Sequence, residues 1–256
     1  MKTVWNAVKK LLIFGVILLL WYLGSRWQWW SAYVLPGPGK VFGTLLDMMA
    51  SGELAEHLLI SLRRVAIGFG ISCALTFVFT LVAVITPRVV PLYTRLLGVI
   101  RHIPPISLIP LLILWFGIGE TPKLIVIVLA SFFPILLNTE TGIFGCDEKL
   151  VEVGKVLNFS KGKIFFRIQL PNAVPNILVG IRIGLGYSWR AIVGAEMIAA
   201  TSGVGYLILD AQALSRTDKV IGGILVIGVI GLLTDALCGW VVGKATSRGN
   251  GGGAVG

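Results

Sequence analysis

The sequence predicts an all-α, polytopic membrane protein with six transmembrane helices. Of its 256 residues, 56% are hydrophobic and only 13% are charged, and the mean hydropathy is +0.90. An average soluble domain carries about 25% charged residues, so this chain could not face water on all sides. Its apolar content is sufficient for six spans of roughly 20 residues each. The composition therefore excludes a soluble globular domain, a disordered chain and a secreted disulfide scaffold.

The N-terminal part, residues 1–60, predicts one transmembrane helix and a segment at the outer face. The apolar run 11–25 is followed by aromatic residues between 27 and 33, which are typical of a membrane interface rather than of a signal cleavage site. Residues 35–39, Leu-Pro-Gly-Pro-Gly, predict a non-helical turn. The mixed segment 41–59 predicts a helix that lies on the outer surface.

Five further spans form a predicted core over residues 61–243. Charges and prolines place these spans at about 65–87, 92–119, 124–144, 174–200 and 220–242. Pro104, Pro105 and Pro110 interrupt the span 92–119 and predict a proline-kinked helix. The tail 244–256 is rich in glycine, which predicts a flexible end.

The net charge of +10 is explained by the positive-inside rule, without a nucleic-acid partner. If both termini are cytoplasmic, twelve basic residues fall on the cytoplasmic side. Seven fall outside: Arg26, Lys40, Arg63, Arg64, Lys123, Arg216 and Lys219. Arg101, Arg182 and Arg190 fall in or near spans. This bias predicts a multi-pass protein of a prokaryotic cytoplasmic membrane with both termini inside.

The polar stretch 147–171 predicts a helix-turn-helix module in the cytosol. Leu150, Val153, Val156 and Leu157 recur at helical spacing and describe an amphipathic helix. Ser160 is a candidate N-cap of a second helix, which Leu170-Pro171 is expected to end. Because an apolar face that projects into the cytosol needs to be covered, this module predicts a soluble partner.

The same stretch resembles the EAA loop of ABC importer permeases. The matching residues are Glu152-Val153-Gly154, Asn158 and Ile168-Gln169-Leu170-Pro171, and Leu157 lies between them. Gly154 stands where this family usually has alanine, and Asn158 where it usually has glycine. Asparagine tolerates a positive φ, so the turn can be kept. The resemblance implies that Glu152, Val153, Gly154, Leu157, Asn158, Ile168, Leu170 and Pro171 form the loop that couples the permease to a cytosolic ATPase.

The resemblance extends over nearly the whole chain. It includes residues 35–38, 61–69, 103–120, 195–198, 202–207 and 217–218. Two stretches within these ranges, Leu-Trp-Phe-Gly-Ile-Gly-Glu and Ala-Glu-Met-Ile, point to one subgroup of the family. The subgroup imports nitrate, aliphatic sulfonates and taurine, and the aliphatic sulfonate permeases are the most similar. The resemblance implies a type I ABC importer permease fold, a homodimer in membrane lipid, a cytosolic ATPase dimer that holds ATP and Mg²⁺, and an extracytoplasmic solute-binding protein.

Charged residues within the spans predict a translocation path. A charge at the bilayer centre costs at least about 2.5–3.5 kcal/mol, so Arg190 and Glu196 are expected to face the protein interior or water. Prolines free backbone carbonyls, which are tolerated at membrane depth only inside protein or beside a cavity. The predicted path is therefore lined by Arg101, Pro104, Pro105, Arg190 and Glu196. Alternatively, these charged side chains snorkel to the membrane surface or form a structural ion pair, and Arg101 lies at an interfacial helix end.

Gly180 and Gly184 form a Gly-x-x-x-Gly motif that allows two helix backbones to approach closely. The motif predicts either the seam of a dimer or a packing contact with a neighbouring helix of the same subunit.

No catalytic, metal-binding or nucleotide-binding motif is apparent. The three cysteines lie far apart, and Pro38-Gly39-Lys40 lacks the preceding glycine and the following hydroxyl of a P-loop. The chain is therefore expected to be a transport subunit that binds no metal or cofactor, with ATP handled by another polypeptide. A stand-alone secondary transporter or channel is the alternative.

Overall fold

The computed structural model describes residues 2–86, 88 and 90–249, which form helices joined by short turns. The first elements are α1 (Lys2–Arg26), α2 (Pro38–Ala50), α3 (Glu53–Ile85), α4 (Val90–Ile100), the 3₁₀ helix η2 (Pro105–Leu108) and α5 (Ile109–Phe116). They are followed by α6 (Glu120–Phe144), α7 (Glu148–Val156), α8 (Lys161–Ile164), the π-helix η3 (Phe165–Gln169), α9 (Leu170–Ala199), α10 (Val204–Ala213) and α11 (Thr217–Gly249).

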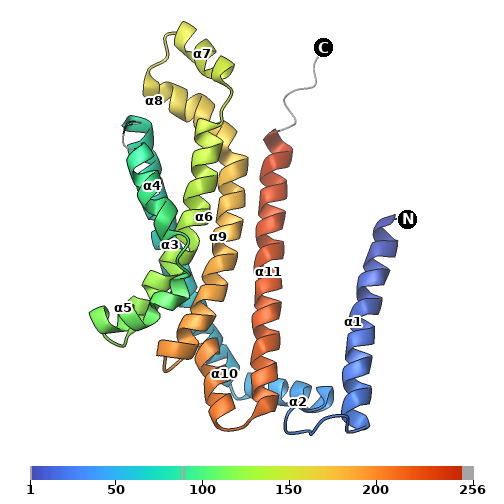
Figure 1. Ribbon diagram of the computed structural model, residues 1–256. Coiled ribbons are helices and arrows are strands. Elements are labelled where there is room, and N and C mark those ends of the chain that lie inside the picture. Colours follow the sequence, from blue (N-terminus) through green and yellow to red (C-terminus); the bar gives the residue numbers. More distant parts are fainter. Residues whose placement is uncertain (1, 87, 89, 250–256) are drawn as a thin grey trace.

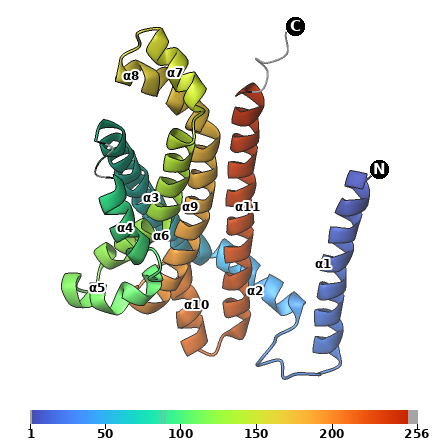
Figure 2. The ribbon, with the colours of Figure 1, turned by 45° about the horizontal axis from the view of Figure 1, so that its top comes forward.

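Helices α6 and α9 lie side by side at the centre of the molecule (Figures 1 and 2). Helix α3 packs against both, and α11 runs along α9. Helices α7 and α8 project beyond one end of this body, the α7 end, whereas α2 and α10 lie at the opposite α10 end. Helix α1 stands apart from α11. It is tied to the chain that follows it by a 3.0 Å hydrogen bond from Trp21 Nε1 to the carbonyl oxygen of Pro36.

The spans agree with the expected fold class. Within the part of the chain that the structure describes, four helices are long and apolar enough to cross a membrane, namely α3, α6, the continuous helix Lys161–Ala199 and α11 as far as Lys244. The bent pair formed by α4 with η2 and α5 is a fifth if it counts as one span. Helix α1 adds a shorter apolar stretch, Leu12–Arg26. The all-α, multi-spanning architecture is confirmed, whereas the count of six is reached only if α1 is included.

The span predicted over 92–119 is interrupted near its prolines, but by a sharp bend between two helical segments rather than by a kink within one helix. The helical segments Tyr93–Ile100 and Pro105–Phe116 make an angle of 83°, so this part of the chain is a broken span or a re-entrant loop. Proline disfavours the helical conformation in the residue before it, and Pro104 itself precedes Pro105 and has a non-helical ψ of 122°. Two adjacent prolines therefore stop α4 rather than bend it.

Three boundaries also differ from those expected. Pro38, predicted to lie in a turn, begins α2, because a proline in the first turn of a helix has no bond to lose. The surface segment 41–59 divides at Gly52, whose φ is +81°, and its last residues already belong to α3. Helix α11 continues through residues 244–249 of the predicted flexible tail, and residues 250–256 lie outside the described part.

Leu170-Pro171 does not end the helix that begins at Lys161. The five-residue π-helix η3 joins α8 to α9, so the helix runs without interruption to Ala199, over 39 residues. The wider π-turn accommodates Pro171, since the proline at the start of α9 has no N–H to place in the α-helical ladder.

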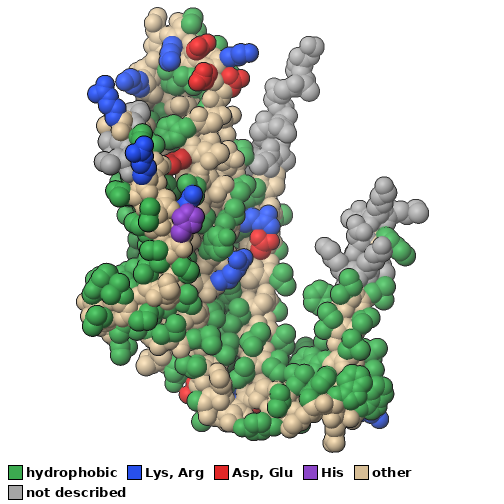
Figure 3. All heavy atoms as spheres, in the orientation of Figure 1, with side chains coloured by type: hydrophobic (Ala, Val, Ile, Leu, Met, Phe, Trp, Pro, Cys, Tyr) green, Lys and Arg blue, Asp and Glu red, His purple; other side chains and the backbone are tan. Residues whose placement is uncertain are grey.

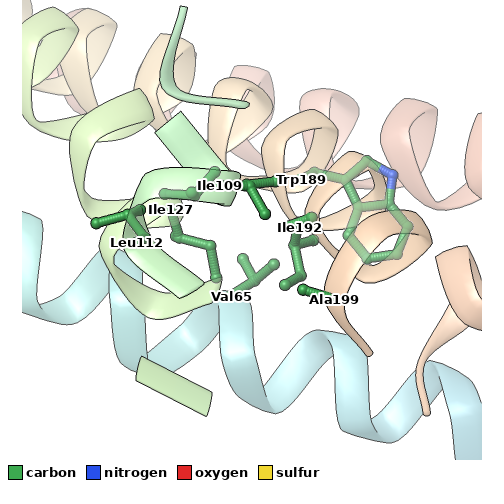
Figure 4. Packing of buried hydrophobic residues seen from close by; sticks show 9 residues of the cluster. Val65, Ile109, Leu112, Ile127, Trp189, Ile192 and Ala199 are labelled. Carbon is green, nitrogen blue, oxygen red and sulfur yellow. The ribbon is translucent and has the colours of Figure 1, made fainter. Parts of the chain in front are cut away.

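The largest cluster of buried apolar side chains joins α3, α5, α6 and α9. Val65, Ile109, Leu112, Ile127, Trp189, Ile192 and Ala199 point toward one another in Figure 4. Trp189 also donates a 3.1 Å hydrogen bond from Nε1 to the carbonyl oxygen of Ile227, which ties α11 to this core.

Gly180 and Gly184 pack α9 against α6 of the same chain. A Cβ atom added at Gly184 would lie 2.7 Å from Cγ1 of Ile135 and 3.1 Å from the carbonyl oxygen of Ser131, and one added at Gly180 would lie 2.8 Å from Cβ of Asn138. Of the two alternatives left open by the motif, these contacts correspond to packing within the subunit, because α6 already fills the space.

A cluster of buried charges holds the helices together at the α10 end. Arg64 on α3 donates to both carboxylate oxygens of Glu120 on α6, at 2.7 Å each, and to Glu196 on α9 at 2.8 Å. Lys123 bonds Glu120 at 2.7 Å. Arg64, Lys123 and Glu196 are at most 5% exposed. With two cations and two anions the cluster is neutral, which is the condition under which burial of charge is tolerated.

The loop between α9 and α10 completes this charge cluster. Ser61 Oγ lies 2.8 Å from each oxygen of Glu196, and the N–H of Gly205 donates to the same carboxylate at 3.1 Å. Arg64 donates to the carbonyl oxygen of Ser202 at 2.7 Å. Gly203 has a φ of +112°, and a Cβ atom there would lie 2.2 Å from the carboxyl carbon of Glu196. Only glycine fits this close approach.

We expect Gly184→Ala to destabilise the protein by about 1–3 kcal/mol through overpacking against Ile135 and Ser131. Gly70→Ala is the matched control, because nothing lies within 4 Å of a Cβ atom at Gly70 and alanine is the better helix former. Thermal unfolding of the detergent-purified variants measures the difference. Equal melting temperatures for the two variants would contradict the tight α6–α9 contact.

We expect Arg64→Met to cost about 3–5 kcal/mol of stability, because it leaves the fully buried Glu196 without its cation. The double variant Arg64→Met/Glu196→Gln should recover a large part of this loss. Arg63→Met, at the neighbouring exposed position, is the control. Melting temperatures provide the readout, and a double variant no more stable than Arg64→Met alone would argue against the ion pair as the cause.

Candidate functional site

Local capping forms the helix-turn-helix at the α7 end. The Asp147 carboxylate accepts a 3.0 Å hydrogen bond from the N–H of Lys149 and caps α7. Ser160 Oγ accepts from the N–H of Lys163 and caps α8, as predicted. Asn158, in the turn between the helices, has a φ of +53°, which is the conformation that its side chain tolerates best among non-glycine residues.

Gly154 fixes α7 against the helix that follows it. It is the buried residue of α7, and a Cβ atom there would lie 2.8 Å from Cδ1 of Ile168 and 3.2 Å from Cγ1 of Ile164. Glycine at a position where alanine is usual therefore brings α7 closer to α8 and η3. Leu170 continues the attachment, since it packs on the buried cluster of Ile143, Phe165 and Ala173.

The opposite side of α7 is an exposed apolar surface, the α7 face. It is formed by Leu150, Val153, Val156 and Leu157, which are between 49% and 81% exposed. Glu152 lies beside them and is also exposed. Figure 3 shows acidic and basic side chains around green ones at this end of the molecule. The predicted coupling residues thus fall into two groups. Glu152, Val153 and Leu157 are accessible to a partner. Gly154, Ile168 and Leu170 attach the loop to the helical body.

Three of the predicted path residues meet at one hollow, the α6–α9 hollow. Its volume is about 540 Å³, and its lining includes Arg101, His102, Pro105, Phe133, Tyr187 and Arg190. Both arginines are exposed, and among the described residues no carboxylate pairs with either of them. The Arg190 guanidinium lies 5.3 Å from the centre of the Tyr187 ring. Pro104 is exposed but does not line the hollow. The hollow therefore presents positive charge to whatever enters it.

Glu196 does not line this hollow. The sequence places it on the path, but the structure buries it completely in the cluster with Arg64 and Ser61. This is the geometry of the structural ion pair that the sequence left as an alternative.

A second hollow, the α9–α11 hollow, has a volume of about 620 Å³ and shares Tyr187 and Arg190 with the first. Its wall contains an ion pair in which Arg182 Nε and Nη2 bond the two oxygens of Asp235 at 2.7 and 2.6 Å. The sequence analysis missed Asp235, although it is the sole charged residue within the apolar run 220–242.

Sequence reasoning counted Arg64 and Lys123 among the basic residues on the outer side of the membrane. The structure buries both in the charge cluster at the α10 end. A further surface pair lies near that end, where Asp218 raises the pKa of the Arg216 guanidinium by accepting its hydrogen bonds at 2.9–3.0 Å.

Comparison with known proteins identifies the family to which these features belong. Residues 66–246 match the model of the family described as binding-protein-dependent transport system inner membrane component. The putative aliphatic sulfonates transport permease protein SsuC of Bacillus subtilis is 41% identical over 229 residues, which cover 90% of this chain and 83% of the relative.

Two further relatives are named for the transport of taurine and nitrate, the other solutes expected for the subgroup. The taurine transport system permease protein TauC of Escherichia coli is 32% identical, over 86% of this chain and 82% of the relative. The nitrate import permease protein NrtB of Leptolyngbya laminosa is 26% identical, over 95% and 89%. The resemblance found in the sequence is confirmed, and transport rather than catalysis is the activity of this family. The chain belongs to the family of binding-protein-dependent transport system inner membrane components, the permease subunits of ABC importers.

Proposed function

We propose that this chain forms the path by which an ABC importer takes up a small anionic solute of the aliphatic sulfonate, taurine or nitrate class. The assignment of an anionic solute rests on two guanidinium groups, those of Arg101 and Arg190, which face the α6–α9 hollow. Neither forms an ion pair with a carboxylate among the described residues. The names of the relatives agree, since aliphatic sulfonates, taurine and nitrate all carry an anionic group.

The geometry of the α6–α9 hollow suits the passage of an oxyanion. Guanidinium groups present planar sets of N–H donors that match the oxygens of a sulfonate or nitrate group. Arg101 follows α4 and Arg190 lies on α9, so the two charges come from opposite walls. Within a low-dielectric body, two unpaired cations lower the barrier that an anion meets in the bilayer. Neither residue takes part in a chemical reaction, so their role is to bind the solute and to release it.

The α7 face fits the contact with an ATPase. Four exposed apolar side chains beside Glu152 need an apolar groove to cover them, and this surface projects beyond the helical body. ATP and Mg²⁺ then belong to the partner ATPase, because this sequence has no P-loop. Closure of an ATPase dimer would displace α7 and, through it, the helices on which the path residues lie.

The orientation in the membrane follows from the same assignment. The beginning of α1 and the end of α11 both point toward the α7 end (Figure 1). If α7 meets a cytosolic ATPase, both termini are cytoplasmic, and the basic residues 149, 155, 161, 163 and 167 accumulate on the same side, in accord with the positive-inside rule. The α10 end then faces the solute-binding protein. Two copies in membrane lipid, with the path between them, complete the proposed importer.

Glu152→Arg should abolish stable association with the ATPase while leaving the protein inserted in the membrane. The substitution reverses the charge beside the α7 face without removing an internal contact, because Glu152 is exposed. Asp210→Arg makes the same charge change at the α10 end, where the carboxylate is also exposed, and serves as the control for the co-purification. Co-purification with the ATPase and ATP-driven uptake are the measurements.

Normal ATPase association and uptake by Glu152→Arg would overturn the coupling assignment. Uptake by wild-type protein purified without any ATPase would instead support a stand-alone secondary transporter or channel.

Arg190→Gln should lower the number of solute molecules moved per ATP by roughly 10- to 150-fold, because the loss of one charge-assisted contact raises the barrier by about 1.5–3 kcal/mol. ATPase stimulation by the loaded binding protein should persist. Arg95→Gln is the control, since Arg95 is exposed on α4 but lies outside both hollows. The ratio of uptake to ATP hydrolysis in proteoliposomes measures the effect, and an unchanged ratio would exclude Arg190 from the path.

A further inference from the structure

The Arg182–Asp235 ion pair lies where charges are costly. Arg182 is twelve residues into α9 and Asp235 eighteen residues into α11, which places them about 18 Å and 27 Å from the first residues of those helices. Both positions are therefore deep inside segments long and apolar enough to cross a membrane. The side chains are nevertheless 41% and 60% exposed in the single chain.

Hydrocarbon does not suit such a pair. Charged side chains within spans face the protein interior or water, and this pair satisfies only part of its hydrogen-bonding capacity. The α9–α11 hollow offers space for water, because its volume of about 620 Å³ corresponds to roughly 20 water molecules at about 30 Å³ each. Figure 3 shows blue and red side chains at mid-height on a face that is otherwise mainly green and tan.

The hollow is also adjacent to the proposed anion path. Tyr187 and Arg190 line both hollows, so a solute that reaches Arg190 is beside the wall that holds Arg182. Of the three arginines along this route, Arg101 and Arg190 form no ion pair with a carboxylate among the described residues, although Asp235 lies within electrostatic range of Arg190. Asp235 neutralises Arg182 directly, through two parallel hydrogen bonds. Asp235 thus determines how many positive charges an entering anion meets.

We propose that the α9–α11 hollow is a water-filled continuation of the anion path, and that Asp235 is a specificity-determining residue that masks Arg182 until the anionic group of a solute replaces it. This inference rests on the proposed function and names a further part of the same path. The ligand class is an organic or inorganic oxyanion with one strongly acidic group. No bond is formed or broken, since the solute exchanges one pair of hydrogen bonds on Arg182 for another.

Charged thiol reagents test both the water and the sign of the potential. After replacement of Cys73, Cys146 and Cys238 by serine, a single cysteine is introduced by Leu232→Cys, a position that is 70% exposed and lines the hollow. The matched control is Leu233→Cys, which is 61% exposed, neighbours it on α11 and does not line the hollow. The permease is reconstituted with its ATPase, and the rates of modification are followed by intact mass.

The two probes are 2-sulfonatoethyl methanethiosulfonate, which is an anionic sulfonate, and its cationic trimethylammonioethyl analogue, with each rate normalised to that of a free thiol. We expect Leu232→Cys to react at least tenfold faster than Leu233→Cys and to favour the sulfonate reagent at least threefold. Asp235→Asn should increase this preference at least threefold by unmasking Arg182. Arg182→Gln should reduce it.

Two outcomes would overturn the proposal. If both cysteines react equally slowly, lipid or a second copy of the chain covers the hollow. If Leu232→Cys reacts but shows no preference that depends on Asp235, the ion pair is structural. The double variant Arg182→Gln/Asp235→Asn keeps a hydrogen bond between the two side chains without their charges. It should therefore unfold at the wild-type temperature and still lose the preference for the sulfonate reagent. This result would distinguish the loss of the charges from a folding defect. Since the reaction needs no transport, a failure of ATP-driven sulfonate uptake would count against the proposed function alone.

Discussion

Every charge inside an apolar helical body must be paired or hydrated, and this constraint divides the charges of the protein into two sets. At the α10 end, Arg64, Lys123, Glu120 and Glu196 form a neutral cluster in which each buried charge bonds a charge of opposite sign. In the middle of the body, Arg101 and Arg190 face open hollows without carboxylate partners among the described residues. The first arrangement stabilises one geometry, whereas the second leaves donors free for an anion. The charges of the framework are thus gathered in one neutral cluster with buried members, whereas the arginines that line the hollows remain accessible.

The helix from Lys161 to Ala199 connects these features mechanically. It begins beneath the α7 face, where Ile164 and Ile168 hold Gly154, and it ends next to Glu196 in the charge cluster. Arg190 lies between these points on the same continuous helix. A displacement of α7 therefore acts on one wall of both hollows, because α7 packs directly on the start of this helix through Gly154. The close contact of Gly180 and Gly184 with α6 makes that neighbouring helix move with it.

Much of this arrangement could be predicted from the sequence, but only the part that depends on local signals. The apolar runs gave the spans, the periodicity of residues 150–157 gave the α7 face, and Asn158 and Ser160 gave the turn and the cap. Contacts between distant segments were not predictable. Arg64 was counted merely as a basic residue on the outer side, because its partners, Glu120 and Glu196, are 56 and 132 residues away. Asp235 was overlooked for the same reason, since its partner lies on another helix.

The sharp bend after α4 places a second element beside the proposed path. Because Pro104 and Pro105 stop α4, the chain turns through 83° and Arg101 is placed at the end of a helix rather than within one. Arg190, by contrast, is fixed within the long helix that begins beneath α7. The two cations of the α6–α9 hollow thus belong to separate elements. A shift of α9 relative to α4 would change the separation of the guanidinium groups, and an oxyanion that bridges both would be held in one position and released in the other. On this geometry, alternating access requires only relative movement of the two walls, with the charge cluster at the α10 end unchanged.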